Sequence, residues 1–152
     1  MAQVFRGRFP HALDPKGRIS VPRKFRDVLA TFEDGENLIV VPDAECLQIF
    51  PLAIWERLEA RFMAKSSLDP RVREFGRGYF SRARDVEMDG AGRVLLPPDS
   101  RQQAGLTRDV LIVGLSMEHF EVWDRGRFEE YDRQTQPRVP QLMEQFAAEL
   151  GS

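Results

Sequence analysis

The pentapeptide DPKGR at residues 14–18 returns 75 residues later as DGAGR at residues 89–93. Each copy begins with Asp and ends with Gly-Arg, follows an apolar residue, and leads into an apolar stretch that ends in proline. Asp at the first position of a turn and Gly at the fourth are typical of a tight connection between two strands. We therefore expect two equivalent hairpin turns, oriented by Asp14, Gly17, Asp89 and Gly92.

The pattern around the turns predicts two units of about 75 residues, each a four-stranded β part that includes one short helix, followed by two further helices. In the first unit we expect strands over 4–13, 19–21, 38–41 and 47–50, and helices over 23–30, 51–65 and 70–79. In the second we expect strands over 83–88, 94–96, 110–114 and 120–123, and helices over 98–104, 124–134 and from 140 onward.

The predicted fold class is α+β. A four-stranded unit has edges that it cannot satisfy alone, so the two units should join in one closed β-barrel with the helices outside it. The expected divisions are 4–53 and 81–124 for the two β repeats, 54–80 for a helical hairpin, and 125–152 for the C-terminal helices. Three apolar stripes are expected to face inward, with any apolar surface left over serving subunit contacts: Trp55/Leu58/Phe62, Val72/Phe75/Tyr79 and Leu142/Phe146/Leu150.

The net charge of −2 conceals a strong segregation along the chain. Residues 1–26 hold seven Lys or Arg against one acidic residue, whereas residues 27–60 hold one against eight. The basic first block could form an electrostatic footprint for nucleic acid, or the opposite blocks could neutralise one another on the folded surface. The single cysteine, Cys46, and the lack of a long apolar segment favour a reducing cytoplasm and no membrane partner.

The residues that usually carry catalysis are few and scattered. The two histidines and one cysteine lack the spacing of a metal site, and no glycine-rich phosphate loop follows a strand. We therefore expect no metal, no cofactor, no small-molecule substrate and no enzymatic activity.

The basic residues near the turns are the candidates for contact with DNA. Arg18 and Arg93 end the two turns, and each could either bridge to its own aspartate or reach into a groove of the duplex. The other candidates, all as phosphate contacts, are Arg6, Arg8, Lys16, Arg23, Lys24 and Arg26 in the first half and Arg82 and Arg84 in the second.

At the level of whole motifs the chain resembles the MraZ family of bacterial transcriptional regulators. The resemblance is carried by FRG at 5–7, HALDPKGRISVPRKFR at 11–26, YFSRAR at 79–84 and DGAGRVLLP at 89–97. It implies two SpoVT/AbrB-type swapped hairpins in one chain and a homo-oligomeric ring. It also implies binding of double-stranded DNA at short direct repeats upstream of the division and cell-wall genes, including the family's own promoter. The second turn departs from the first in having no lysine at the position of Lys16.

Taken with the residues themselves, the resemblance predicts a cytoplasmic, nucleoid-associated, sequence-specific DNA-binding regulator that acts as a repressor. The aspartates would then orient the turns while Arg18 and Arg93 reach the nucleic acid. The alternative is an oligomeric protein-interaction scaffold without direct DNA readout, motivated by the acidic blocks and the helical surface.

Overall fold

The two halves of the chain carry the same elements in the same order. The computed structural model describes residues 3–151. The first half contains β1 (Phe5–Ala12), β2 (Arg18–Ser20), α1 (Arg23–Leu29), β3 (Asn37–Pro42), β4 (Leu47–Pro51), α2 (Leu52–Met63) and α3 (Pro70–Gly78). The second contains β5 (Arg84–Glu87), β6 (Arg93–Leu95), α4 (Pro98–Gln103), β7 (Asp109–Met117), β8 (Phe120–Asp124), α5 (Arg125–Thr135) and α6 (Val139–Ala147), with short 3-10 helices at Phe80–Arg82 and Gln136–Arg138.

This order confirms the predicted α+β class and the predicted succession of strands and helices. The ends of most elements lie within one or two residues of expectation, and β7 differs most because it continues to Met117 instead of ending at Gly114. Asp69 caps α3, since its side chain accepts a hydrogen bond from the backbone N–H of Arg71 at 2.9 Å.

The strands of the two halves are interleaved in antiparallel sheets. One sheet has the order β1-β7-β8-β4-β3-β5, and β2 pairs with β6 in a second sheet. The first strand of each half therefore pairs with a strand of the other half, β1 with β7 and β5 with β3. At the centre of both sheets, residues 75 positions apart face each other, Ile19 opposite Val94 and Leu47 opposite Val122. The arrangement has an approximate twofold symmetry, and closure of the two sheets into one barrel stays a prediction.

The main hydrophobic core lies inside this shared β body. The rings of Phe5, Phe25 and Phe120 form a mutually contacting trio with centroids 5.0 Å apart. The strands of both halves surround the trio with fully buried aliphatic side chains, among them Ile19, Leu38, Leu47, Val94, Ile112 and Val122. Neither half could bury these residues alone, so the core depends on the interleaved strands.

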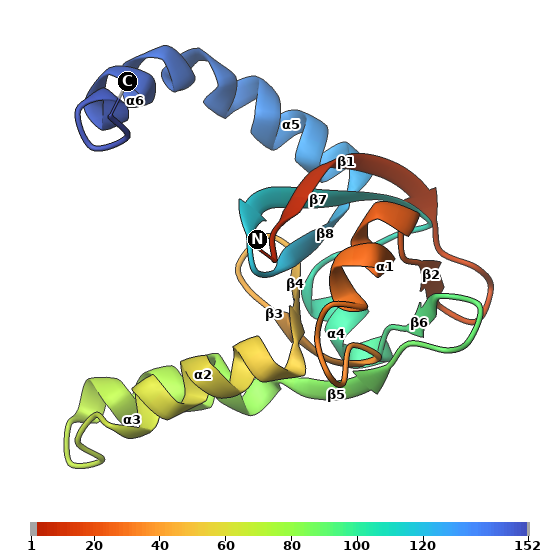
Figure 1. The fold of residues 1–152 in the computed structure, drawn as a ribbon, viewed down its shortest axis with the longest axis horizontal. Helices are drawn as coiled ribbons and strands as arrows, with labels where there is room; N and C mark the ends of the chain where they lie inside the picture. Colours follow the sequence, from red (N-terminus) through yellow and green to blue (C-terminus); the bar gives the residue numbers. More distant parts are fainter. Residues whose placement is uncertain (1–2, 152) are drawn as a thin grey trace.

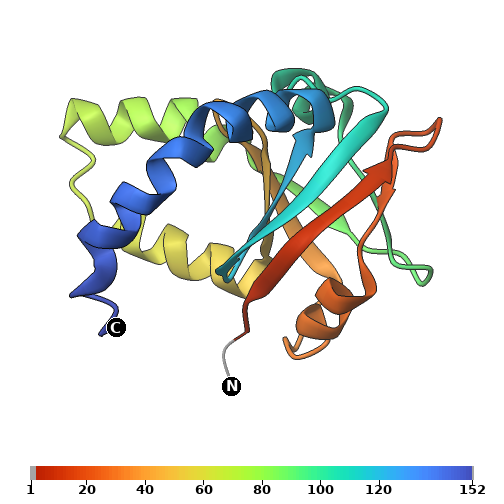
Figure 2. The same cartoon turned by 90° about the horizontal axis from the view of Figure 1, so that it is seen from above.

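Two helical arms extend from the β body on the side away from the two turns (Figures 1 and 2). One arm is α2 with α3, and the other is α5 with α6. Trp55 at the base of the first arm is 2% exposed and belongs to a second core cluster with Phe50 and Ile54. None of the helices in the described range combines the length and apolar character that a bilayer crossing requires.

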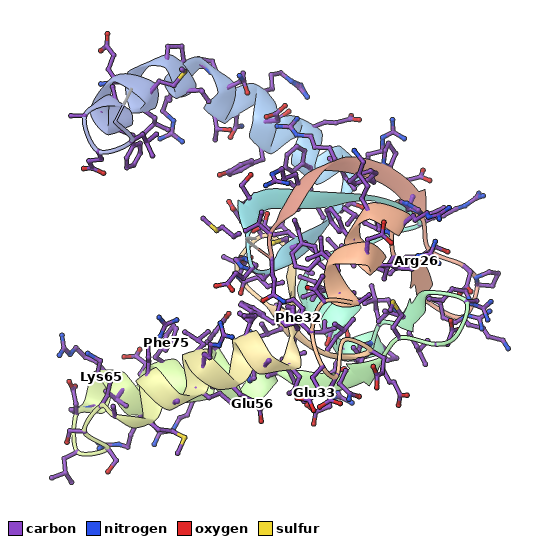
Figure 3. The ribbon with its side chains drawn as sticks, in the orientation of Figure 1. Arg26, Phe32, Glu33, Glu56, Lys65 and Phe75 are labelled. Carbon is purple, nitrogen blue, oxygen red and sulfur yellow. The ribbon has the colours of Figure 1, made fainter. Side chains whose placement is uncertain are left out.

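Some apolar residues of the arms that were expected to be buried are exposed. Phe75 was expected to face inward, yet it is 52% exposed and α3 has no buried residue. Its ring stacks on that of Tyr79 and meets that of Phe62 edge-on, both within its own arm (Figure 3). Leu142 and Phe146 of α6 are likewise 44% and 47% exposed. Helical periodicity identified these apolar faces correctly but not whether the same chain covers them.

A substitution at the centre of the core and one at its counterpart in the second half should behave differently. Phe25→Ala removes a ring that contacts other core phenylalanines, so it should lower the free energy of unfolding by about 3–5 kcal/mol. Ser100 lies 75 residues later and is also buried, but its hydroxyl has no hydrogen-bond partner within residues 3–151. Ser100→Ala should therefore change stability by at most about 1 kcal/mol, in the stabilising direction. Chemical denaturation at one protein concentration measures both, and similar losses would contradict the proposed core.

Candidate nucleic-acid interface

The first turn is held closed by the carboxylate of Asp14. One carboxylate oxygen accepts hydrogen bonds from the backbone N–H groups of Lys16 and Arg18, both at 2.9 Å. The other oxygen accepts from Nε of the Arg18 side chain at 2.6 Å. Backbone bonds from Gly17 to Asp14 and from Asp14 to Arg18 complete the turn. Gly17 has φ of +85°, a conformation that residues with a Cβ rarely adopt.

The second turn repeats this geometry contact for contact. Asp89 accepts from the backbone N–H groups of Ala91 and Arg93, both at 2.9 Å, and from Nε of Arg93 at 3.1 Å. Gly92 has φ of +78° and donates to the carbonyl of Asp89 at 2.9 Å. The aspartates and glycines thus occupy equivalent positions in the two turns.

The two aspartates are poised to stay ionised. The backbone N–H of Arg18 is the main cause that lowers the pKa of Asp14, and the backbone N–H of Arg93 does the same to the pKa of Asp89. Each charged carboxylate then keeps its turn closed and its arginine oriented.

The internal Asp–Arg bridge left open by the sequence is present in both turns. It uses only Nε of each guanidinium, and within residues 3–151 the terminal nitrogens of Arg18 and Arg93 make no hydrogen bond. Both side chains are partly exposed, 28% for Arg18 and 40% for Arg93. Bridging to the aspartate and reaching toward a ligand are therefore compatible, because they use different edges of the same group.

The pairing of β2 with β6 brings the two turns to the same end of the body (Figures 1 and 2). Two reciprocal backbone bonds reinforce it, from Val21 N–H to the Gly92 carbonyl at 2.8 Å and from Leu96 N–H to the Gly17 carbonyl at 3.1 Å. Each turn is thus anchored to the residue that follows the return strand of the other repeat, and both turns lie at the same end of the body.

The remaining candidate cations fall into two groups. Lys16, Arg23, Lys24 and Arg6 are exposed, and Arg6 shares a shallow depression with Lys24 beside α1. The others are also on the surface but have protein neighbours. Arg8 pairs with Asp132 of α5 at 3.1 Å, Arg84 pairs with Asp99 of α4 at 2.7 Å, and Arg82 lies in a groove beside α3 with Arg71 and Glu74.

Two further arginines lie against the glycines of the turns. Arg26, expected to contact phosphate, lies against Gly92 of the second turn (Figure 3), and Arg101, which was not predicted, lies against Gly17 of the first. Arg101 stands 75 residues after Arg26, so the repeat spacing contained the signal for it.

A cluster of possible metal ligands lies elsewhere, between the β3–β4 connection and β8. The ligand atoms of Asp43, Cys46 and Glu121 lie within 4.8 Å of one another. Asp43 already accepts from two backbone amides, and Glu121 accepts from the indole of Trp123 at 2.8 Å. Burial raises the pKa of Cys46, with the two carboxylates adding to the shift, so the thiol stays protonated and donates to Asp43. These hydrogen bonds explain why the three side chains lie close together, and no bound ion is needed to explain it.

Comparisons with known proteins agree with the doubled architecture. A family model described as "MraZ protein, putative antitoxin-like" matches residues 4–78 and again residues 79–146. The chain is 39% identical over 125 residues to the transcriptional regulator MraZ of Nitrosospira multiformis, covering 82% of this chain and 84% of that protein. It is 37% identical over 145 residues to the protein of the same name from Variovorax paradoxus (95% and 99% covered) and 36% over 147 residues to that from Syntrophobacter fumaroxidans (97% and 96%).

The lowered pKa of Asp14 gives a pH-dependent prediction. A carboxylate whose pKa is lowered by folding contributes stability that is fully present above the ordinary aspartate pKa of 3.8 and lost as the pH falls through the folded pKa. Asp14→Asn should therefore be less stable than the unmodified chain at pH of about 5, and the difference should shrink as the pH approaches about 2. Asp27→Asn is the control, because Asp27 is exposed and accepts no hydrogen bond in the described range. Denaturation curves measure the stability difference between Asp14→Asn and the unmodified chain at each pH. If that difference stays constant as the pH falls, the charged carboxylate does not stabilise the turn.

Proposed function

This chain belongs to the MraZ family, and from that premise we propose that it is a sequence-specific DNA-binding transcriptional regulator. Relatives that align over nearly the whole chain are named transcriptional regulator MraZ, and this family is one of regulators and not of enzymes. The observation that carries the proposal is the pair of matching turns at one end of the body, each offering an arginine whose terminal nitrogens have no partner among the described residues.

The geometry of the turns suits the recognition of bases or phosphates. Asp14 and Asp89 hold Nε of their arginines, which fixes the plane of each guanidinium before any ligand arrives. The two terminal nitrogens then form a fork that matches the O6 and N7 acceptors of guanine in the major groove, or two phosphate oxygens. Because the fork is already oriented, less side-chain entropy is lost on binding.

The cations around the turns supply the non-specific part of the binding. We assign the stronger phosphate contacts to Lys16, Arg23, Lys24 and Arg6, which are exposed near the first turn or on β1. Arg8, Arg82 and Arg84 are weaker candidates, since acidic neighbours offset part of their charge. The second turn also lacks a lysine, so the first repeat should contribute more to affinity.

We further propose that the body is an AbrB-like swapped-hairpin barrel made from two internal repeats. The exchange of β1 and β5 between the halves and the central β2–β6 pair support this proposal. Its parts would be the repeats at 4–53 and 81–124, the helical hairpin at 54–80 and the C-terminal helices at 125–152.

The proposed target and outcome follow the family resemblance. We propose that the chain represses transcription from short direct repeats upstream of the division and cell-wall gene cluster, its own promoter included, and that it works in the cytoplasm on the nucleoid. Direct repeats suit a homo-oligomer that presents several copies of the same surface, because tethered copies gain affinity through effective concentration.

The arms offer the surface for such a homo-oligomer, which we propose is a ring. Their exposed apolar side chains include Met63, Leu68 and Phe75 on the first arm and Leu142, Met143, Phe146 and Leu150 on the second. An exposed apolar surface of this kind marks a site of association, and a second copy of the chain would cover it without blocking the turns at the opposite end.

Loss of the first arginine fork should weaken specific binding. Arg18→Ala should lower the affinity for duplex DNA from upstream of the native gene about 5- to 150-fold, because one bidentate contact to a base is worth about 1–3 kcal/mol. Fluorescence anisotropy at one fixed salt concentration measures it, and circular dichroism confirms that the variant is folded.

Arg133→Ala removes the same charge from α5, far from the turns, and should bind as the unmodified chain does. Equal affinity of the unmodified chain for upstream and scrambled DNA would refute sequence-specific regulation. It would favour a protein-interaction scaffold without DNA readout.

Charges placed on the apolar face of α6 should break the oligomer. The double variant Leu142→Asp with Phe146→Asp should sediment as a smaller species, because association would bury both charges. Gln141→Asp on the same helix adds one charge at an exposed polar position and should leave the sedimentation unchanged. The arms would be excluded as the interface if both sets of variants sedimented alike.

A further inference from the structure

We propose that Arg101 positions the first turn and Arg26 positions the second, so that each DNA-reading turn is set by an arginine from the opposite repeat. The inference rests on the proposed DNA-binding function of the turns and names the residues that determine their shape. Neither arginine is assigned a contact with DNA.

The first turn shows how Arg101 acts. A Cβ built on Gly17 would lie only 2.6 Å from Cζ of Arg101, so the guanidinium occupies the space that a side chain at this position would need. Nε of Arg101 donates to the carbonyl of Leu96 at 3.1 Å, and the N–H of Leu96 donates to the carbonyl of Gly17 at 3.1 Å. Gly17, Leu96 and Arg101 thereby form a closed cycle of contacts that crosses from one repeat to the other.

The second turn has the matching contact from Arg26. A Cβ on Gly92 would lie 2.6 Å from Cδ and 2.8 Å from Nη1 of Arg26, and Val21 N–H donates to the Gly92 carbonyl at 2.8 Å. The cycle is incomplete here, because Nε of Arg26 is buried without a hydrogen-bond partner in the described residues. Arg26 thus holds its turn by packing, and Arg101 by packing together with a hydrogen bond.

These contacts restrict the residue immediately before each reading arginine. Gly17 precedes Arg18 and Gly92 precedes Arg93, and both glycines have positive φ. Glycine has the greatest backbone freedom of any residue because it lacks a Cβ. An arginine side chain packed this closely against the glycine excludes alternative backbone positions. Without it the turn would have to be ordered when DNA binds, which reduces affinity.

The surroundings of Arg101 and Arg26 favour a positioning role over direct contact with phosphate. Nε of Arg101 is used by a backbone carbonyl, Nε of Arg26 is buried, and both side chains lie against a glycine of a turn. A phosphate contact would need only positive charge, which lysine also supplies. At Gly17 the packing atoms are Cζ, Nε and Nη1 of the Arg101 guanidinium, a planar group that lysine lacks.

Hydrogen exchange tests the positioning without DNA. Arg101→Met should speed amide exchange in the segment 14–18 and leave 89–93 unchanged, and Arg26→Met should do the reverse. Arg101→Lys should resemble Arg101→Met, and it serves as the second variant should the methionine variant fail to fold. The proposal would be overturned if exchange became faster in the turn that belongs to the same repeat as the substituted arginine, or if it stayed unchanged in both turns.

Double-variant cycles with the upstream DNA test the consequence for binding. Arg101→Met should weaken binding about five- to tenfold while preserving the dependence of affinity on salt, because no phosphate contact is lost. Combined with Arg18→Ala it should add little, whereas combined with Arg93→Ala the two losses should multiply. Arg26→Met should add little to Arg93→Ala, whereas its loss should multiply with that of Arg18→Ala.

A reduced salt dependence, or full rescue by Arg101→Lys, would instead make Arg101 a phosphate contact and overturn its positioning role. Absence of any specific binding by the unmodified chain would refute the proposed function, and the exchange experiment would still decide whether the arginines position the turns.

Discussion

The pairing of β2 with β6 is the interaction on which the rest of the structure depends. Each is a three-residue strand, too short to be stable as an isolated pair, yet together they join the two repeats at their centre. Ile19 and Val94 face each other there and are fully buried in the shared core. The backbone bonds at Gly17 and Gly92 extend the same junction into the turns, so the core that holds the repeats together also holds the turns together.

This junction divides the molecule into two ends with different tasks. The turns lie at one end, where carboxylates close them and arginine forks remain available. The arms lie at the other end, where apolar side chains remain exposed on α3 and α6. Binding of a polyanion at one end and association at the other can therefore occur together, as a regulator that reads repeated DNA sites requires.

Much of the fold could be predicted from the sequence because its strongest signals are local. Asp14 and Gly17 determine a turn through bonds that span four residues, and the repeat at Asp89 and Gly92 doubles that signal. The bridge from Arg18 to Asp14 was one of two predicted options, and it turned out to leave the other option open. The predictions that failed concerned contacts between residues distant in the sequence. Phe75 carried a correct helical pattern without a covering partner, and the contact of Arg101 with Gly17 joins opposite repeats.

Methylation interference on the upstream DNA tests most directly whether the two turns read bases. A methyl group on guanine N7 occupies the place that the fork of Arg18 or Arg93 would approach in the major groove. We expect DNA methylated at guanines within the direct repeats to be depleted from the bound fraction, and part of that depletion to disappear with Arg18→Ala. Sequence-specific binding that is indifferent to N7 methylation at every guanine of the repeats would contradict base readout by the two turns.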